Sequence, residues 1–201
     1  MIIGLLIIFS LNTYSSQISS SPNTNKSLNK TNEPKFCHYW LPLFKPLCHH
    51  LYQTWTEGNN ELYLSGYAWH NRFTYSPERL REKKYNELAW GGGFGKGFFD
   101  EKGNWHGLYA FIFLDSHRHV EPIAGYAYLI TAHLTQNFKA GLGISVFLTA
   151  RPEYFHNAPF PGAAPWAGLF YKKVSLKAAY VPGSSTTGNV LYLVGTYAFD
   201  K

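Results

Sequence analysis

The spacing of the turns is the feature that most constrains how this chain folds. From Glu61 onward the sequence forms short alternating runs, and we predict strands at 61–70, 85–98, 105–114, 122–133, 138–149, 166–172, 174–181 and 190–199. The connections alternate strictly between short turns, such as 100–104, and longer segments, such as 71–84. Barrels of outer-membrane type have short turns at one end and long loops at the other. The pattern therefore predicts an all-β fold, an eight-stranded antiparallel transmembrane β-barrel over 58–201.

The two faces of the predicted strands differ in side-chain size. In 138–149, Leu142 and Ile144 lie on one face, and Gly141 and Gly143 lie on the other. A water-soluble barrel fills its interior with the larger side chains. We instead expect the large and aromatic side chains to face lipid, while Gly and Ala keep a narrow slot open inside.

Composition excludes several classes of protein. Aromatic residues make up 18% of the chain and charged residues 15%, which argues against a disordered chain or a coiled coil. No apolar run reaches the ~18 residues that a membrane-spanning helix needs. The net charge of +6 comes without an arginine-rich helix or an aromatic–basic motif. We therefore expect no nucleic-acid partner, whereas an anionic membrane surface fits this charge.

The N-terminal residues differ from the barrel. Residues 1–20 contain an apolar run followed by small polar residues, which predicts a signal peptide. Residues 21–35 are polar and predict a disordered linker. In 36–57, apolar and aromatic residues follow helical spacing, which predicts an amphipathic helix at a membrane interface, with 47–57 as its better part. A helix packed on a soluble core is the alternative that this segment leaves open.

The chain has two cysteines, Cys37 and Cys48. On a continuous helix they would lie about 16 Å apart, too far for a disulfide. Pro42 and Pro46 interrupt such a helix. The sequence therefore leaves the pairing of the cysteines open.

Polar residues fall where the predicted strands meet the long loops. They are His70, Asp115, Ser116 and Arg151. A histidine base, a serine hydroxyl and a carboxylate are the groups that acyl transfer requires. Without further information, however, these residue types alone favour solvated side chains at the rim over a catalytic site.

The chain also has nine histidines, which raises the question of a metal site. His117 and His119 can share a face, but His106 and His133 fall at the opposite rim of the predicted barrel. Because these four side chains cannot converge, we expect no metal ligands and no other cofactor.

Four motifs carry a resemblance to a known family. They are AWHNRF at 68–73, WGGGFG at 90–95, DEKGNWHGLYA at 100–110 and EPIAGY at 121–126. Four shorter matches complete the set, namely YNE at 85–87, DS at 115–116, YVPG at 180–183 and GNV at 188–190. Over roughly 53–199 the chain resembles the PagP family, the lipid A palmitoyltransferases of the bacterial outer membrane. The block from 100 to 126 is the most specific part of the match.

The resemblance implies a monomeric enzyme of the bacterial cell outer membrane. It implies transfer of a palmitoyl or similar long chain from a glycerophospholipid donor to a lipid A acceptor in the outer leaflet. The catalytic His, Asp and Ser of the family fall on His70, Asp115 and Ser116. His70, supported by Asp115, would deprotonate the acceptor hydroxyl. Ser116 would act either as nucleophile or as oxyanion donor.

The resemblance also suggests residues that bind substrate. Gly125 and Ala127 are expected at the floor of the acyl slot, with Ala127 where glycine is common, which predicts a preference slightly short of palmitate. Pro182 is expected where the wall parts to admit lipid, whereas Ser65 replaces a proline frequent on the first strand. Independently of the resemblance, Arg151 at the outer rim can pair with lipid A phosphates, with a solvated charge at the rim as the open alternative.

Two other functions use the same features. A passive lipid-binding barrel or adhesin would need no catalytic residues. A lipid A deacylase or phospholipase would use the same residue types. The number of acyl chains on lipid A distinguishes all three.

Overall fold

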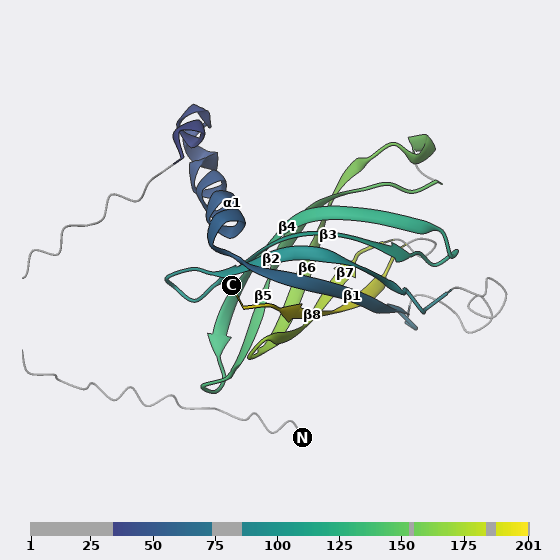
Figure 1. Cartoon of the computed structure of the whole chain (residues 1–201). Helices are drawn as coiled ribbons and strands as arrows, with labels where there is room; N and C mark the ends of the chain where they lie inside the picture. The colour runs from purple at the N-terminus through teal and green to yellow at the C-terminus, as the bar shows by residue number, and fades with distance from the viewer. Residues whose placement is uncertain (1–33, 74–85, 153–154, 184–187, 201) are drawn as a thin grey trace, which may run out of the picture. The chain divides into compact units, whose positions relative to one another are not determined.

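The computed structural model describes residues 34–73, 86–152, 155–183 and 188–200. In these ranges eight antiparallel strands form a closed barrel in which each strand pairs with its neighbours in sequence and β8 pairs with β1 (Figure 1). The strands are β1 (Asn59–His70), β2 (Gly91–Phe99), β3 (Trp105–Leu114), β4 (Val120–His133), β5 (Phe138–Thr149), β6 (Phe160–Tyr171), β7 (Val174–Val181) and β8 (Val190–Ala198). The predicted barrel fold is confirmed.

Two strand boundaries differ from the sequence prediction by six residues, and the others agree to within two. Strand β2 begins at Gly91 rather than near residue 85. The preceding segment instead lies beside β1, because the Ala68 N–H donates a 2.9 Å hydrogen bond to the Glu87 carbonyl. Strand β6 begins at Phe160 rather than at 166, although its first half contains two prolines.

The prolines of β6 are accommodated because that half of the strand has one hydrogen-bonded neighbour. Strand β6 pairs with β5 from Phe160 to Tyr171, but its pairing with β7 starts at Trp166. Pro161 and Pro165 are four residues apart, so their missing N–H groups face the same side of the strand. Proline is tolerated where a strand has a free edge.

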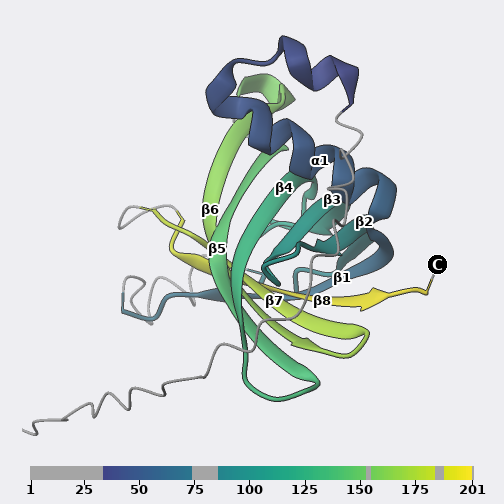
Figure 2. The same cartoon turned by 90° about the vertical axis from the view of Figure 1, so that its left-hand side faces the viewer.

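Helix α1 (Lys45–Glu57) precedes the barrel and follows two short 3-10 turns, η1 (Lys35–Tyr39) and η2 (Pro42–Phe44). It lies against β2 and β3 (Figure 2). The His50 ring stacks on the His106 ring of β3 with 4.3 Å between centroids, and Lys96 of β2 lies over the Trp55 ring. Among the helices that the structure describes, none is long and apolar enough to cross a membrane.

A disulfide joins Cys37 to Cys48, with 5.7 Å between the Cα atoms. The pairing that the sequence left open occurs because the chain turns between η1 and α1 instead of continuing as one helix. The predicted signal peptide (1–20) and nearly all of the predicted linker (21–35) lie outside the described residues.

The outward face of the wall is apolar, as expected. Leu142, Ile144, Val146 and Leu148 of β5 are all at least half exposed on the isolated chain. They form one continuous row on the side of the strand that faces away from the interior, because alternate residues point to opposite faces.

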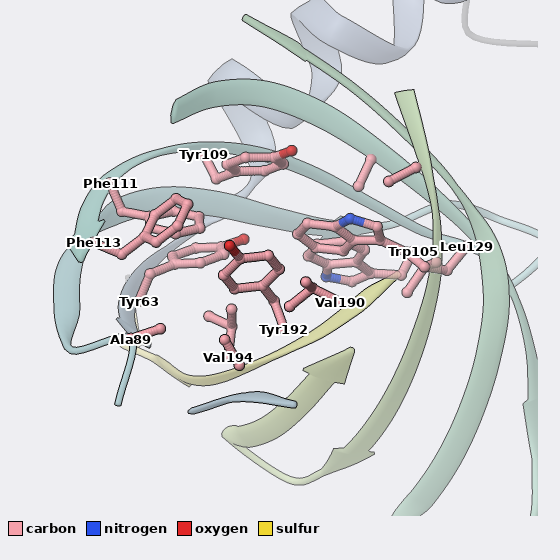
Figure 3. Close-up of a cluster of buried hydrophobic side chains, with 14 of the residues drawn as sticks. Tyr63, Ala89, Trp105, Tyr109, Phe111, Phe113, Leu129, Val190, Tyr192 and Val194 are labelled. Atoms are coloured by element: carbon pink, nitrogen blue, oxygen red, sulfur yellow. The ribbon is translucent and has the colours of Figure 1, made fainter. Parts of the chain in front are cut away.

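The interior, in contrast, is not kept open by small residues alone. Rings from several strands fill much of it (Figure 3). The buried rings are Tyr63, Trp105, Tyr109, Phe111, Phe113, Trp166, Phe170 and Tyr192. The expectation of an interior lined mainly by Gly and Ala is therefore wrong for a large part of the barrel. An eight-stranded barrel is just wide enough for side chains to fill, and here aromatic rings do so.

A buried ion pair lies among these rings. The Lys177 ammonium is 2.9 Å from Glu61 Oε2 and 2.9 Å from Thr196 Oγ1, and it lies 4.1 Å from the centroid of the Trp105 ring. Lys177 is 1% exposed. Its charge is compensated by a carboxylate, a hydroxyl and an aromatic face, which is what a buried ammonium requires.

Candidate active site

One rim of the barrel collects the residues that the sequence singled out. Strands β1, β3, β5 and β7 run toward this rim, so the chain leaves it at the long connections (Figure 1). His70 ends β1, Asp115 and Ser116 follow β3, Arg151 follows β5 and Pro182 follows β7. The antiparallel topology thus gathers residues from distant parts of the sequence at one end of the barrel.

His70 and Ser116 are in direct contact. His70 Nε2 lies 2.9 Å from Ser116 Oγ, although the residues are 46 positions apart in sequence. His70 is 1% exposed, so its ring is held by the surrounding wall. An imidazole at this distance can take a proton from the hydroxyl, or from an acceptor hydroxyl that binds beside it.

Asp115 supports the turn that presents Ser116. Its Oδ1 accepts hydrogen bonds of 2.8 Å from the backbone N–H groups of His117 and His119, and its Oδ2 lies 3.6 Å from His119 Nδ1. Arg118 in the same turn has a φ of 65°. The strand pattern ends at this turn, so the strict alternation of faces along β3 no longer applies to Asp115 and Ser116, and these hydrogen bonds of the Asp115 carboxylate lie within its own turn.

Glu87 lies on the other side of the histidine. Its Oε1 is 3.5 Å from His70 Nδ1, and its carboxylate pairs with the Arg72 guanidinium at 2.7 Å. Burial, the largest influence, disfavours the charged carboxylate, but hydrogen bonds from Arg72 and from the His70 N–H outweigh it and lower the pKa of Glu87. Glu87 belongs to the YNE match at 85–87, but the sequence assigned it no role, because only the contact of the 86–90 segment with β1 brings it to His70.

A cavity of about 310 Å³ lies within the barrel. Its lining residues include Phe111 on β3, Ile123 on β4, Phe147 on β5, Trp166 on β6 and Val194 on β8. The lining is mostly apolar, and it suits a hydrocarbon chain more than a polar ligand.

Two of the four predicted substrate-binding residues line this cavity, namely Arg151 and Pro182. The Arg151 side chain is engaged within the protein, because its Nε donates a 2.7 Å hydrogen bond to Glu121 Oε2. Thr149 donates a second 2.7 Å hydrogen bond to the same carboxylate. This arrangement fixes a cation at the wall of the cavity, where it can meet a lipid headgroup.

Gly125 and Ala127 lie deeper in the barrel than the inward residues of β4 that line the cavity, Glu121 and Ile123. The hydroxyl of Tyr109 on β3 reaches across β4 to Ser145 Oγ on β5, at 2.6 Å. A Cβ atom added at Gly125 would lie 2.7 Å from the Tyr109 hydroxyl oxygen. Gly125 therefore leaves room for a Tyr109–Ser145 bridge, which lies one inward position beyond the cavity lining on β3 and β5.

Ala127 is fully buried at the next inward position of β4, beyond that bridge. It pairs with Ser145, one end of the bridge. On β3, β4 and β5 the cavity lining ends at Phe111, Ile123 and Phe147, which on β4 is two inward positions short of Ala127.

Histidines at the opposite end of the barrel form a separate cluster. His106 Nε2 lies 3.2 Å from Asp100 Oδ2, and His106 Nδ1 lies 2.6 Å from the Tyr126 hydroxyl. Within the ranges that the structure describes, no group of three or more His, Cys, Asp or Glu residues is arranged to hold a metal ion.

Comparisons with known proteins agree with this geometry. A family model described as "Antimicrobial peptide resistance and lipid A acylation protein PagP" matches residues 50–196. A protein of Legionella longbeachae serogroup 1 (strain NSW150), named Lipid A acyltransferase PagP, is 67% identical to this chain and covers 100% of it, with 96% of the relative matched.

Proteins of the same name from two other sources are also similar. The one from Legionella pneumophila is 58% identical over 86% of this chain and 90% of the relative. The one from Bordetella pertussis (strain CS) is 45% identical over 81% of this chain and 88% of the relative. The region matched by the family model contains His70, Glu87, Asp115 and Ser116.

Proposed function

The chain belongs to the PagP family of lipid A acylation proteins, and on that premise we propose that it transfers a palmitoyl or similar long acyl chain from a glycerophospholipid to lipid A. The reaction takes place in the outer leaflet of the bacterial outer membrane, and the enzyme acts as a monomer. The observation that carries the proposal is the 2.9 Å contact between His70 Nε2 and Ser116 Oγ. It lies at the same rim of the barrel as Arg151 and Pro182, which line an apolar cavity.

The reaction follows from the groups at the rim. The lipid A hydroxyl gives its proton to His70 Nε2, and its oxygen attacks the ester carbonyl carbon of the donor. The bond from that carbon to the glycerol oxygen then breaks, and the proton on His70 passes to the glycerol oxygen. The products are acylated lipid A and a lysophospholipid.

Ser116 takes part in one of two ways. As nucleophile, it gives its proton to His70 and attacks the donor ester, and the glycerol oxygen leaves with that proton as a lysophospholipid. The lipid A hydroxyl then gives its proton to His70 and attacks the acyl-serine, and the serine oxygen leaves and takes the proton back. As oxyanion donor, it stabilises the charge that develops on the ester oxygen. Asp115 holds the turn that sets Ser116 in place through its two backbone hydrogen bonds.

The barrel wall offers two places for lateral entry of lipid. Pairing of β6 with β7 starts at Trp166, and Pro182 lies just beyond the end of β7. Pairing of β1 with β2 ends at Ser65 and Gly91, and beyond that point the segment 86–90 is hydrogen-bonded to β1, so entry on this side requires that segment to separate from β1. Strand edges without ladder hydrogen bonds can separate at lower cost than paired strands.

The N-terminal helix is proposed to lie at the membrane interface. Trp40, Leu43, Phe44 and Trp55 are exposed on the isolated chain. The described residues from 34 to 56 include lysines and histidines but no acidic residue, which favours contact with anionic headgroups.

The experiment that tests the proposal counts the acyl chains of lipid A. Mass spectra are compared for lipid A from a bacterial host that lacks such an activity, with and without this protein. A gain of one chain supports transfer, a loss indicates a deacylase, and no change indicates a passive barrel. His70→Ala and Ser116→Ala are each expected to abolish the gain while the barrel stays folded. Retention of full activity in both variants would overturn the assignment of the site.

A further inference from the structure

A histidine that acts as a base needs a partner at its second nitrogen. With Nε2 directed to the hydroxyl, the neutral ring must carry its proton on Nδ1, and a carboxylate at Nδ1 selects that tautomer. The same carboxylate stabilises the imidazolium that forms when the base takes a proton. The group nearest Nδ1 of His70 therefore bears on catalysis without touching the substrate.

The geometry points to Glu87 as the residue that orients His70 for catalysis, an inference that rests on the proposed function. Its Oε1 lies 3.5 Å from His70 Nδ1 and also 3.4 Å from the His70 backbone nitrogen. The side chain is 24% exposed and the imidazole 1% exposed, so the pair lies at the edge of the buried region. Catalytic hydrogen bonds are commonly long before substrate binds and shorten when the site closes.

The Glu87 carboxylate is itself held in place. Arg72 Nη2 lies 2.7 Å from Oε1 and donates a 2.8 Å hydrogen bond to Oε2, while the Tyr67 hydroxyl lies 3.4 Å from Oε2. These contacts fix the orientation of the carboxylate and favour its charged form. Arg72 thus acts on His70 through Glu87.

A purely structural role for Glu87 makes a different prediction. The segment 86–90 is joined to β1 by the Ala68 N–H to the Glu87 carbonyl and by the Ser65 hydroxyl to the Ala89 carbonyl. Both of these hydrogen bonds use backbone acceptors and survive a change of side chain. The substitution Glu87→Gln therefore removes the charge while keeping the segment attached.

The test compares three variants of the full chain in detergent micelles that contain a phospholipid donor and lipid A. Glu87→Gln is expected to lower kcat by about 10²-fold or more with little change in KM, because the amide leaves the ring in the wrong tautomer. Glu87→Asp keeps the charge and is expected to recover part of kcat. Glu101→Gln, the same change at an exposed turn residue of the opposite end, is the matched control and is expected to match the wild type.

A second readout does not depend on turnover. The nitrogen NMR signals of the His70 ring, identified by their loss in His70→Ala, report which nitrogen carries the proton. We expect a proton on Nδ1 in the wild type and a shift toward Nε2 in Glu87→Gln. This readout tests Glu87 even where the wild type transfers no acyl chain, an outcome that counts against the proposed function alone.

Two results would overturn the inference. One is an unchanged tautomer in Glu87→Gln. The other is a Glu87→Gln enzyme that keeps the wild-type kcat per folded barrel and differs only in KM or in the folded fraction, which would show that Glu87 acts through structure or substrate binding.

Discussion

The depth of the cavity leads to a prediction about acyl-chain length. On three adjacent strands the cavity lining stops at Phe111, Ile123 and Phe147. The next inward residues on β3 and β5 are Tyr109 and Ser145, whose hydroxyl groups are hydrogen-bonded at 2.6 Å. Replacing Tyr109 with leucine removes both the ring and the bridge, and it extends the cavity toward the level of Ala127.

The size of the change follows from strand geometry. One further inward position is two residues along a strand, roughly 6.6 Å, and a strand tilt of about 40° reduces this to about 5 Å along the barrel axis. A zigzag chain with bonds of about 1.52 Å and angles of about 111° advances about 1.25 Å per carbon, so the extension accommodates about four more carbons. Tyr109→Leu is therefore expected to prefer a chain about four carbons longer than the wild type does.

The assay is competition among phospholipid donors that differ only in the length of their saturated chains, read from the mass of the acylated lipid A. Because one methylene in an apolar pocket changes selectivity by about 1–3 kcal/mol, a shift of this size is readily measured. Tyr109→Phe is the matched control, since it removes the hydroxyl but keeps the ring beyond the cavity lining, and it is expected to keep the wild-type preference. Only folded barrels, identified by their mobility on unheated SDS gels, are compared.

One outcome would refute the reasoning. If folded Tyr109→Leu and the wild type prefer the same chain length, then either the acyl chain does not occupy this cavity or the cavity does not end at Tyr109. An Ala127→Gly variant separates these ideas further. It is expected to change the preference little by itself, and to add to the effect of Tyr109→Leu once the bridge is gone.

Three further predictions concern stability. Cys37→Ser removes the disulfide and leaves Cys48 as a free thiol, which is expected to reduce the local stability of the segment between them by about 3 kcal/mol. Proteolysis near η1 should accelerate, while the melting temperature of the barrel stays unchanged. Lys177→Met should destabilise the barrel by about 3–5 kcal/mol in urea unfolding because it leaves Glu61 buried and unpaired, and adding Glu61→Leu should recover most of the loss. Burial, the largest influence, opposes the charge of Asp100, but hydrogen bonds lower the pKa of its carboxyl below the usual value. The charged Asp100 carboxylate therefore stabilises the folded barrel above about pH 4, and this stabilisation is lost as the pH falls through the lowered pKa. The urea midpoint of Asp100→Asn should accordingly fall less on acidification than that of the wild type.

The sequence by itself determined the architecture and which residues share the rim. Strand alternation and turn chemistry are local properties, so the eight strands and their short and long connections could be assigned without any long-range contact. Once the strand directions were known, His70, Asp115, Ser116 and Arg151 had to fall at one end of the barrel. The predicted strand boundaries were wrong where tertiary contacts outweighed local preference, as in β6, whose prolines are tolerated at an edge without a hydrogen-bonded neighbour.

Only the tertiary structure decided which side chains meet. The contact of Glu87 with His70 depends on a segment outside the strands lying beside β1. The bridge from Tyr109 to Ser145 crosses an intervening strand at a glycine. Such contacts depend on barrel closure, register and side-chain reach, which no local pattern encodes, and so the orientation of the base and the depth of the acyl cavity could not be predicted from the sequence.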